Sequence, residues 1–529
     1  MKRKILTMSV AAGLIVPTAA CGDSGGEDAL VVGTTDRVSI SSDAPAPLDP
    51  AYAYDIATWN ILRQTVQTLM VQPKGDGAPV PEAAEQCDFT DMKSERYACT
   101  LRKDLKFANG DPITSKDVKF SLDRALSIQA DSGVFGILST LDTVETRGEH
   151  EVVFHLNAPD ATFPFKLSTP VAGIVNSKDY RKDELREGFV VDGSGPYTMD
   201  AEVEDGELVS ATFSRNPHYT GTVEHRNEEV ELSFFADAAS MGAALADDAI
   251  DVMTRTMSPA RIRELARAST DDVNLVELPG LEIRYLAFNT DAPSVEDKAV
   301  RQAMAQVINR SELVAGVYGS QADPLYSLVP ASLPGHTNAF LNKYGEPDTG
   351  RARALLTEAG VTTPVKLTLH YTTDHYGPDT KKEFEILRRQ LNDSGLFDVA
   401  IAGTAWKDFR PAQMRGEYEV YGMGWFPDYP DADSYITPFL TKDNTLKSPY
   451  VSREIRDTLL PESRSKAERI DAAPSLTAIQ EIVAEDVPLL PLWQGKQYVA
   501  AGDHITGSAY VVSSGADLRL WEIRRGIKQ

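Results

Sequence analysis

The chain has 529 residues, of which 78 are acidic and 53 are lysine or arginine, giving a net charge of −25. Such an acidic balance argues against nucleic-acid binding and against a basic face that lies on a membrane, because both need positive surface. A chain of this length exceeds what one hydrophobic core usually organises, and a hydrophobic content of 42% is ample for folded cores, so we expect two lobes with one of them subdivided.

The N-terminus has the pattern of an export signal. Within residues 1–20, three positive side chains precede an apolar stretch that is too short to span a bilayer as a helix. The small residues before Cys21 are similar to a bacterial lipoprotein cleavage box, with Thr18 where that box usually has leucine. We therefore expect lipidation of Cys21 and a polar tether over residues 21–28, and plain secretion with cleavage near Ala20 is the alternative.

Strand and helix patterns mix along the rest of the chain. Apolar runs predict strands at residues 30–33, 97–105, 152–156, 283–289, 365–370, 418–423 and 487–493. Helical spacing predicts helices at residues 56–70, 115–126, 294–308, 351–359, 381–391 and 475–485, and Thr114 and Ser294 are the expected caps of two of them. This irregular mixture favours an α/β fold with mixed sheets.

The usual sequence patterns of catalysis and metal binding are missing. The chain contains no Gly-x-x-x-x-Gly-Lys-[Ser/Thr], no Gly-x-Gly-x-x-Gly and no His-Glu-x-x-His. Ser194 lacks the Gly-x-Ser-x-Gly spacing of a nucleophile elbow. His370 and His375 have Asp374 as their acidic neighbour, and we interpret them as loop residues before metal ligands. We therefore expect a binding protein without a cofactor or a bound metal rather than an enzyme.

Residues 424–433 are the most informative segment. They place aromatic rings and three carboxylates around Pro427 and Pro430, which fix φ and bias the residues before them toward extended conformations. A stiff loop of this composition can hold a cationic, partly apolar ligand between rings and an acid. An ordinary acidic surface turn is the alternative, because aspartate and proline are common turn residues.

Cys87 and Cys99 are the cysteines that remain once Cys21 carries a lipid. In an oxidising compartment we expect them to form a disulfide, and closing a loop of that size would stabilise the fold by about 3 kcal/mol. Two free buried thiols are the alternative.

Short motifs spread over residues 30–525 carry a resemblance to one family. Each motif is weak alone, but in this order and over this length the chain resembles the large solute-binding proteins of ABC importers, bacterial extracellular solute-binding protein family 5, with oligopeptide-, dipeptide- and nickel-binding members. The motifs are Leu101-Arg102 with Phe107, Gly110-Asp111-Pro112, Asp117-Val118, Gly195-Pro196-Tyr197, Arg215-Asn216-Pro217, Phe288-Asn289-Thr290, Val300-Arg301-Gln302-Ala303, Trp425 to Asp433, and Val487-Pro488-Leu489-Leu490-Pro491-Leu492.

The resemblance implies a periplasmic-binding-protein-like clamp, in which the ligand is closed between two hinged lobes. Hinge strands would cross near residues 282–286 and 493–497. The implied parts are lobe I at residues 29–60, 190–282 and 495–529, an inserted subdomain II at 61–189, and lobe III at 283–494.

The resemblance also assigns a ligand-binding role to the acidic loop. In peptide-binding members the aspartate of a Trp-x-x-Asp-Tyr motif pairs with the α-amino group of the ligand, and that position here is Asp428. A buried ammonium needs such a partner, because its desolvation is otherwise unfavourable. Trp425 and Tyr429 would wall the pocket, with lobe packing as their alternative role. Further candidates for ligand contact are Tyr52, Tyr54, Tyr285, His375 and Tyr376.

One contact of some oligopeptide-binding members is missing. An arginine that helps to hold the ligand carboxylate stands six residues before the aspartate in those members, and Gly422 occupies that position here. Solvated surface is the first interpretation of the candidate substitutes and ligand binding the second; they are Arg284, His375, Lys407, Arg410 and Arg415.

We therefore expect a monomeric receptor, lipid-anchored on the outer face of the bacterial cell membrane, that captures peptides and delivers them to ABC permease and ATPase subunits. The first alternative is another small solute on the same fold, such as a nickel chelate or an oligosaccharide. The others are a surface lipoprotein hydrolase and a receptor that signals without import.

Overall fold

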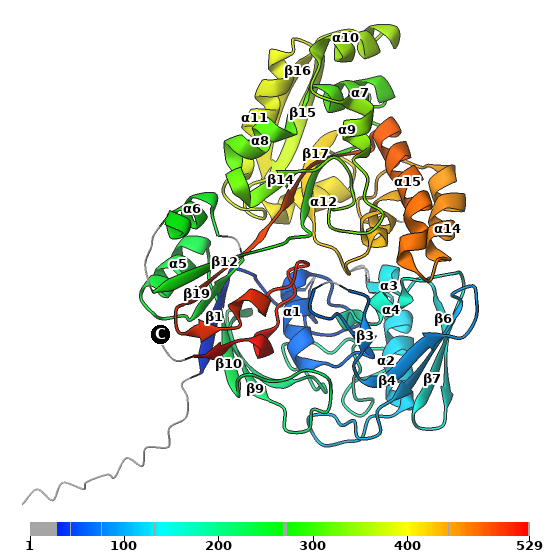
Figure 1. Ribbon diagram of the computed structural model, residues 1–529, viewed down its shortest axis with the longest axis vertical. Coiled ribbons are helices and arrows are strands. Elements are labelled where there is room, and N and C mark those ends of the chain that lie inside the picture. Colours follow the sequence, from blue (N-terminus) through cyan, green and yellow to red (C-terminus); the bar gives the residue numbers. More distant parts are fainter. Residues whose placement is uncertain are drawn as a thin grey trace, which may run out of the picture.

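The structure, a computed structural model, describes residues 29–526 except residues 43, 76, 131–133, 256, 268–271 and 443. The expected signal sequence, Cys21 and the tether lie outside the described residues. Two bodies follow each other along the long axis of the molecule (Figure 1). We call them the lower lobe (residues 29–278 and 497–526) and the upper lobe (residues 283–495).

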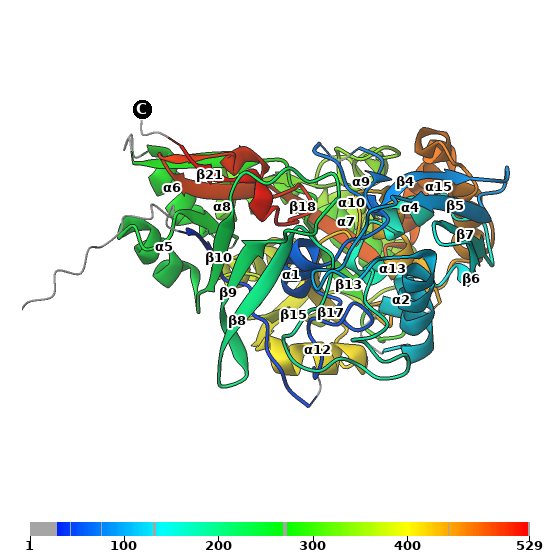
Figure 2. The same cartoon turned by 90° about the horizontal axis from the view of Figure 1, so that it is seen from below.

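A seven-stranded mixed sheet forms the centre of the lower lobe. Its order is β12 (Val273–Leu278), β19 (Gln497–Gly502), β11 (Val252–Thr254), β1 (Leu30–Thr34), β10 (Glu229–Phe234), β9 (Glu207–Arg215) and β8 (Tyr197–Glu204). β1 is parallel to β10 and β11, whereas β8 and β9 form a long antiparallel hairpin at one edge (Figure 2). The longer helices of this body outside the second sheet described next are α1 (Ile56–Thr65), α5 (Ala238–Ala246) and α6 (Pro259–Arg267).

The outer part of the lower lobe is a second sheet, which we call the four-stranded domain together with its helices (Figure 1). Its order is β4 (Ala84–Phe89), β5 (Arg96–Leu101), β7 (Glu151–Leu156) and β6 (Leu141–Arg147), all antiparallel. Its helices are α2 (Ser115–Ile128), α3 (Val134–Ile137) and α4 (Phe163–Lys166). Cys87 and Cys99 lie opposite each other on β4 and β5 and are joined by a disulfide.

The upper lobe is built on a six-stranded mixed sheet. Its order is β14 (Ala322–Pro324), β18 (Leu489–Gly495), β13 (Ile283–Phe288), β17 (Val420–Trp425), β15 (Val365–Thr372) and β16 (Phe397–Thr404). The surrounding helices are α7 (Lys298–Val307), α8 (Arg310–Val317), α9 (Ala339–Tyr344), α10 (Thr349–Glu358), α11 (Thr380–Asp393), α12 (Trp406–Met414), α13 (Thr437–Leu440), α14 (Leu460–Arg464) and α15 (Ala473–Asp486).

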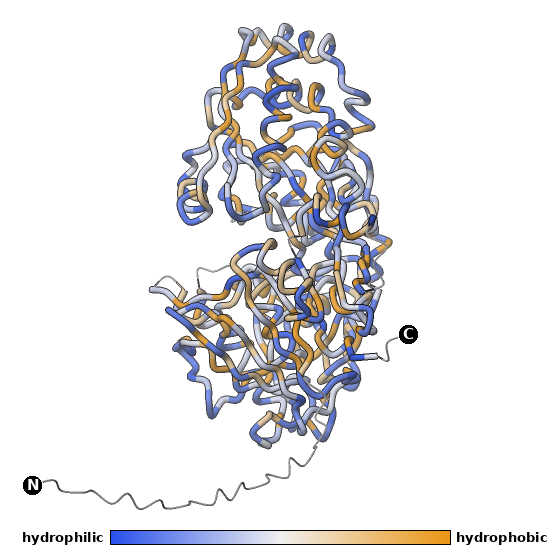
Figure 3. Tube along the Cα trace, turned by 90° about the vertical axis from the view of Figure 1, so that its left-hand side faces the viewer, coloured by the Kyte–Doolittle hydropathy of each residue, from blue (hydrophilic) through white to orange (hydrophobic). Residues whose placement is uncertain are grey.

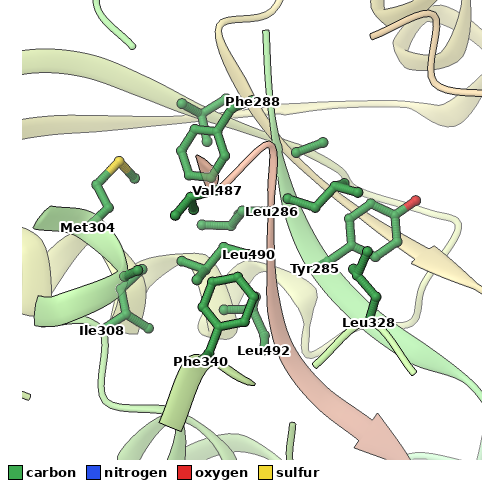
Figure 4. Close-up of a cluster of buried hydrophobic side chains, with 14 of the residues drawn as sticks. Tyr285, Leu286, Phe288, Met304, Ile308, Leu328, Phe340, Val487, Leu490 and Leu492 are labelled. Carbon is green, nitrogen blue, oxygen red and sulfur yellow. The ribbon is translucent and has the colours of Figure 1, made fainter. Parts of the chain in front are cut away.

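The central strands of the upper lobe are covered on both faces. Every residue of β13 is buried, and side chains of β13 and β18 such as Phe288 and Leu490 meet Met304 and Phe340 in one apolar cluster (Figure 4). This explains why their sequences are continuous apolar runs instead of alternating ones. Both lobes keep apolar segments inside and hydrophilic segments outside (Figure 3). Within the described residues, no helix combines the length and the apolar character needed to cross a membrane.

Two short segments connect the lobes. Residues 279–282 lead from β12 to β13, and Lys496 alone separates β18 from β19. The two segments touch, because the Gly495 N–H donates to the Glu282 carbonyl at 2.9 Å. The first crossing lies before residue 283, because β13 pairs with β17 over its whole length. The fold is an α/β two-lobe clamp with mixed sheets, as predicted.

Helix α1 is shorter than its sequence pattern. Its apolar spacing continues to residue 70, but the helix ends at Thr65. The Thr65 carbonyl accepts from the Gly195 N–H at 2.9 Å, and the Gln67 carbonyl accepts from the Ile174 N–H at 2.8 Å. These distant partners hold the backbone extended where the local pattern favours helix. The expected boundary between lobe I and subdomain II at residue 60 falls inside this helix.

The two expected caps have different outcomes. Thr114 and Asp117 form the expected capping box of α2. The Thr114 side chain accepts from a backbone N–H in the first turn of the helix, and the Asp117 side chain accepts from the Thr114 backbone N–H. Ser294 does not cap α7, because its hydroxyl donates to the Glu419 carboxylate. Asp297 is the cap instead and accepts from the Ala299 N–H at 2.8 Å.

Candidate functional site

The acidic loop begins at the end of β17, at the junction of the lobes. The Trp425 indole N–H donates to the Ser434 carbonyl at 2.8 Å, and the Ser434 hydroxyl accepts from the Asp428 N–H at 2.9 Å. Trp425 also packs edge-on against Phe439, with ring centroids 5.2 Å apart. Trp425 and Ser434 thus fix the backbone that presents Asp428.

Asp428 meets the lower lobe directly. Its carboxylate accepts from the Tyr54 hydroxyl at 3.2 Å, across 374 positions of sequence. Loss of solvation raises the pKa of Asp428 to about 7, although the Tyr54 hydrogen bond and the charge of Lys166 act in the opposite direction. Within the described residues, no lysine or arginine forms an ion pair with this carboxylate.

The cavity beside Asp428 is formed by both lobes. Pro427 to Pro430 line it from the upper lobe, and Arg63, Ser168 and Asp517 line it from the lower lobe. The last three residues also line a second cavity within the lower lobe, whose lining does not include Asp428. The Asp428 carboxylate therefore borders a small cavity at the place where the two lobes meet.

The other two carboxylates of the loop have fixed partners. Asp431 receives two hydrogen bonds from Arg469, at 2.8 and 3.0 Å. Asp433 is fully buried and receives hydrogen bonds from Arg464 at 2.9 and 3.2 Å, and Arg464 is the main charge that lowers the pKa of Asp433. The alternative of a solvated acidic turn therefore does not describe this segment.

The aromatic candidates lie in different surroundings. Tyr429 is buried, donates its hydroxyl to Asp433 at 2.9 Å and packs against Phe165 of the four-stranded domain. Tyr285 is buried in β13, and within the described residues its hydroxyl has no hydrogen-bond partner. Tyr52 lies in the turn before α1, and Tyr54, two residues later, reaches Asp428.

His375 and Tyr376 form an aromatic cluster after β15. The His375 ring stacks on Trp406 at the start of α12, with centroids 3.8 Å apart. Loss of solvation and the charges of Arg284 and Arg255 lower the pKa of His375 to about 4, so the ring is neutral at neutral pH. The Arg284 guanidinium lies 4.0 Å from the centroid of the Tyr376 ring.

The candidate carboxylate-binding cations differ in whether they are already paired. Arg284 forms an ion pair with Glu282, Arg415 forms one with Glu417 on the surface, and Lys407 is exposed. Arg410 donates to the Gln413 side chain and to the Thr445 carbonyl, and none of the described acidic residues forms an ion pair with it. Its charge lowers the pKa of Tyr54 and of Tyr285, against the larger effect of burial, which raises both.

Sequence reasoning missed a second contact between the lobes. Arg255, which follows β11 in the lower lobe, lies over the Phe426 ring of the acidic loop at 4.9 Å. It also forms an ion pair with Asp36 at 3.1 Å and adopts a left-handed backbone with φ of 62°. No local motif marks Arg255, because its partners lie 171 and 219 positions away.

The described residues include no group of three or more histidine, cysteine or carboxylate side chains that could hold a metal ion. The site instead offers the Asp428 carboxylate and aromatic side chains where the two lobes meet. The two-lobe fold is that of a solute-binding protein of the clamp class.

Comparison with known proteins identifies the family. The sequence pattern of the bacterial extracellular solute-binding proteins, family 5, matches residues 78–447, and the chain belongs to this family.

Individual relatives match along nearly the whole chain. The chain is 25% identical over 499 residues to the probable D,D-dipeptide-binding periplasmic protein DdpA of Escherichia coli K12, covering 92% of each chain. It is 23% identical to the dipeptide-binding protein DppE of Bacillus subtilis 168, covering 96% of this chain and 97% of the other. Among solved structures, DppA of Helicobacter pylori in complex with the peptide STSA has a TM-score of 0.77 at 20% identity, covering 95% of this chain and 98% of that one.

Proposed function

We propose that the protein is the receptor of an ABC importer and that it captures short peptides between its lobes. The observation that carries the proposal is the Asp428 carboxylate, which lies at the lobe junction with a neutral hydroxyl partner while its neighbours Asp431 and Asp433 are paired with arginines. A ligand ammonium would supply the missing positive charge. The dipeptide-binding relatives support a peptide as the ligand.

Arg410 is our candidate for the opposite end of the ligand. It replaces the arginine that is missing at Gly422, and Arg284 is less suitable because Glu282 already neutralises it. Arg410 and Asp428 both act electrostatically on Tyr54, and we therefore assign the two charged ends of the ligand to these two residues. Tyr376, His375 and Tyr285 would line the space between them.

The remaining parts of the proposal concern the whole receptor. We propose that lobe I comprises residues 29–60, 190–282 and 495–529, with subdomain II at 61–189 and lobe III at 283–494. Lipid on Cys21 would hold the monomer at the outer face of the cell membrane, where it delivers its ligand to the permease and ATPase subunits. The receptor itself performs no catalysis in this proposal.

The test compares free-amine and N-acetylated peptides by isothermal titration calorimetry. Mass spectrometry of ligand retained through gentle purification supplies the peptide. Asp428→Asn is expected to weaken binding of the free-amine peptide by about 2–5 kcal/mol, because it removes one member of a buried charge pair. N-acetylation should weaken binding to the wild type and have little further effect on the variant.

Asp457→Asn is the matched control, because Asp457 is an exposed upper-lobe carboxylate that pairs with its neighbour Arg456. It should bind like the wild type. Equal wild-type affinity for the free and acetylated peptide would refute the role of Asp428, and turnover of the peptide would favour a hydrolase.

A further inference from the structure

The second cavity of the lower lobe lies between α1 and the segment of residues 517–521 near the end of the chain. The Leu518 N–H of that segment donates to the Asn60 side chain of α1 at 2.8 Å, so the two are neighbours (Figure 1). Other walls come from β2 (Met70–Val71) and from the segment after α4. A volume of about 50 Å³ gives room for a few waters or for a small molecule of similar size.

Arg519 lines this cavity and carries a buried charge without an acidic partner. The residue is 8% exposed, and within the described residues no carboxylate forms an ion pair with it. Its Nη2 donates to the backbone carbonyls of Gln72 and Pro73 at 3.4 and 3.1 Å. A buried guanidinium is normally paired with an anion, because removing its water is otherwise unfavourable. The anion that Arg519 requires is therefore missing from the described side chains.

A second buried arginine shows how the protein itself can compensate such a charge. Arg310 in α8 is 4% exposed and also forms no ion pair among the described residues. Its guanidinium lies 5.0 Å from the centroid of the Tyr326 ring and 5.5 Å from that of the Phe340 ring, whose negative faces attract a cation. Within the described part of the chain, no aromatic ring lies against Arg519 in this way. Its charge is therefore left to a ligand.

Uncharged groups in the wall of the cavity also lack partners. The side-chain oxygens of Gln67 and Gln72 and the Nε of Arg63 are buried and have no hydrogen-bond partner within the described residues. The two amide nitrogens donate elsewhere, to the Glu82 carboxylate at 3.2 Å and to the Gly77 carbonyl at 2.5 Å. The cavity thus offers two free acceptors beside an unpaired positive charge.

The two carboxylates in the wall are already occupied. Asp517 pairs with Arg63 at 2.8 Å, and Glu82 accepts hydrogen bonds from Tyr219 and Thr222. Ordered water could serve the two free amide oxygens, as it does at many buried polar groups. Water cannot neutralise a guanidinium, so water alone does not account for this cavity.

We propose that this cavity is a binding site for a small carboxylate-bearing molecule, with Arg519 as the partner of the carboxylate. Gln67 and Gln72 would accept hydrogen bonds from an ammonium, amide or hydroxyl group of the same molecule. A small amino acid such as glycine has this chemistry, because its two charged groups are separated by one carbon. The inference goes beyond the proposed function and holds whether or not Asp428 binds a peptide.

Two sources can supply the carboxylate. The second cavity and the cavity beside Asp428 share part of their lining, namely Arg63, Gln72, Ser168 and Asp517. A free amino acid would occupy the second cavity independently, whereas an acidic side chain of a captured peptide would enter it from the cavity beside Asp428. The experiment has one arm for each source.

The first arm is isothermal titration calorimetry of the ligand-depleted receptor with glycine, acetate and methylammonium. Glycine should bind one to one, acetate more weakly, and methylammonium not at all, because its charge is that of Arg519. Arg519→Gln should weaken glycine binding by at least about tenfold. If this variant does not fold, Gln67→Leu keeps the test open, since it removes an acceptor without a charge and should weaken glycine binding more than acetate binding.

Two control variants separate this site from other parts of the molecule. Arg310→Gln removes a buried arginine that likewise has no described ion pair, and it should bind glycine like the wild type. Asp428→Asn should also leave glycine binding unchanged. Glycine binding that is lost in Asp428→Asn and kept in Arg519→Gln would overturn the inference, because the amino acid would then occupy the proposed peptide site.

The second arm compares the dipeptides Ala-Glu and Ala-Gln. If a peptide side chain fills the cavity, Arg519→Gln should weaken Ala-Glu at least about tenfold more than Ala-Gln, and glycine should not bind the receptor saturated with Ala-Glu. If a free amino acid is the occupant, the variant should affect both dipeptides equally and glycine should still bind. Absence of glycine binding together with equal effects on both dipeptides would show that the cavity holds water only and would overturn the inference. Failure of both dipeptides to bind, with glycine binding that depends on Arg519, would overturn the proposed function alone.

Discussion

Three carboxylates in one loop behave differently because their partners differ. Arg469 binds Asp431, and Arg464 binds Asp433, so that both acids hold the loop in place. The Asp428 carboxylate accepts a hydrogen bond from the Tyr54 hydroxyl, and the Asp428 backbone N–H is held by the Ser434 hydroxyl. The paired acids hold the loop, and the remaining one, which forms no ion pair among the described residues, is the acid to which our proposal assigns the ligand ammonium.

The raised pKa of Asp428 predicts that peptide affinity depends on pH. The ionised carboxylate is the form that binds an ammonium, so affinity should fall by up to about tenfold per pH unit below the pKa of about 7. Above pH about 8 the ligand amine loses its own proton, and affinity should fall again. Calorimetric titration of a free-amine dipeptide between pH 5 and pH 9 measures the fall in affinity at low pH and the fall at high pH. A wild type that binds equally at pH 5 and pH 7 would contradict the prediction.

At the scale of elements, strand β17 and the acidic loop after it could be predicted from the sequence, whereas the distant residues that contact the loop could not. The spacing of Trp425 and Asp428 is a local motif and identifies the loop directly. Arg464 and Arg469 lie more than 30 positions further on in helical segments, and Arg255 lies in another lobe. Their roles depend on tertiary contact, which no local period or propensity encodes.

The missing arginine at residue 422 also has an explanation at this scale. A Cβ atom on Gly422 would lie 2.3 Å from the Phe384 ring, because α11 packs its aromatic side chain closely onto β17. An arginine here, as in some oligopeptide-binding members, therefore does not fit this packing. In the proposed peptide complex, the cation for the ligand carboxylate comes from another element, for which Arg410 in α12 is our candidate.

Gly422→Ala should accordingly be destabilised by about 1–3 kcal/mol, because overpacking forces the ring or the strand to move. Combining Gly422→Ala with Phe384→Leu should recover part of the lost stability, because the smaller side chain leaves room for the added methyl group. Urea denaturation of the single and double variants gives the coupling between the two sites. Gly136→Ala is the control, since its Cβ would meet no atom within 4 Å. Simple additivity of the two changes would show that Phe384 is not the obstacle.

At the scale of the molecule, the lobes are joined by two crossings that lie side by side. The Gln494 side chain donates to the Gly280 carbonyl at 2.7 Å, which ties the second crossing to the first. The Leu281 carbonyl accepts from the Tyr435 hydroxyl at 2.6 Å, and Tyr435 lies just beyond the acidic loop. Movement at the crossings is therefore connected to the segment that carries Asp428.

Gly280 offers a direct test of closure. A Cβ atom there would lie 2.2 Å from the Gly495 carbonyl oxygen, and the next nearest atoms are also backbone, so the two crossings would have to separate. Because lobe closure requires the crossings to move together, Gly280→Val should weaken peptide binding by at least about tenfold, or about 1.4 kcal/mol. Small-angle X-ray scattering should show that the wild type contracts on adding peptide and that the variant does not. The Gly136→Ala variant is the control and should contract like the wild type. If the Gly280→Val variant contracts to the same radius of gyration as the wild type, the lobes do not close about these crossings.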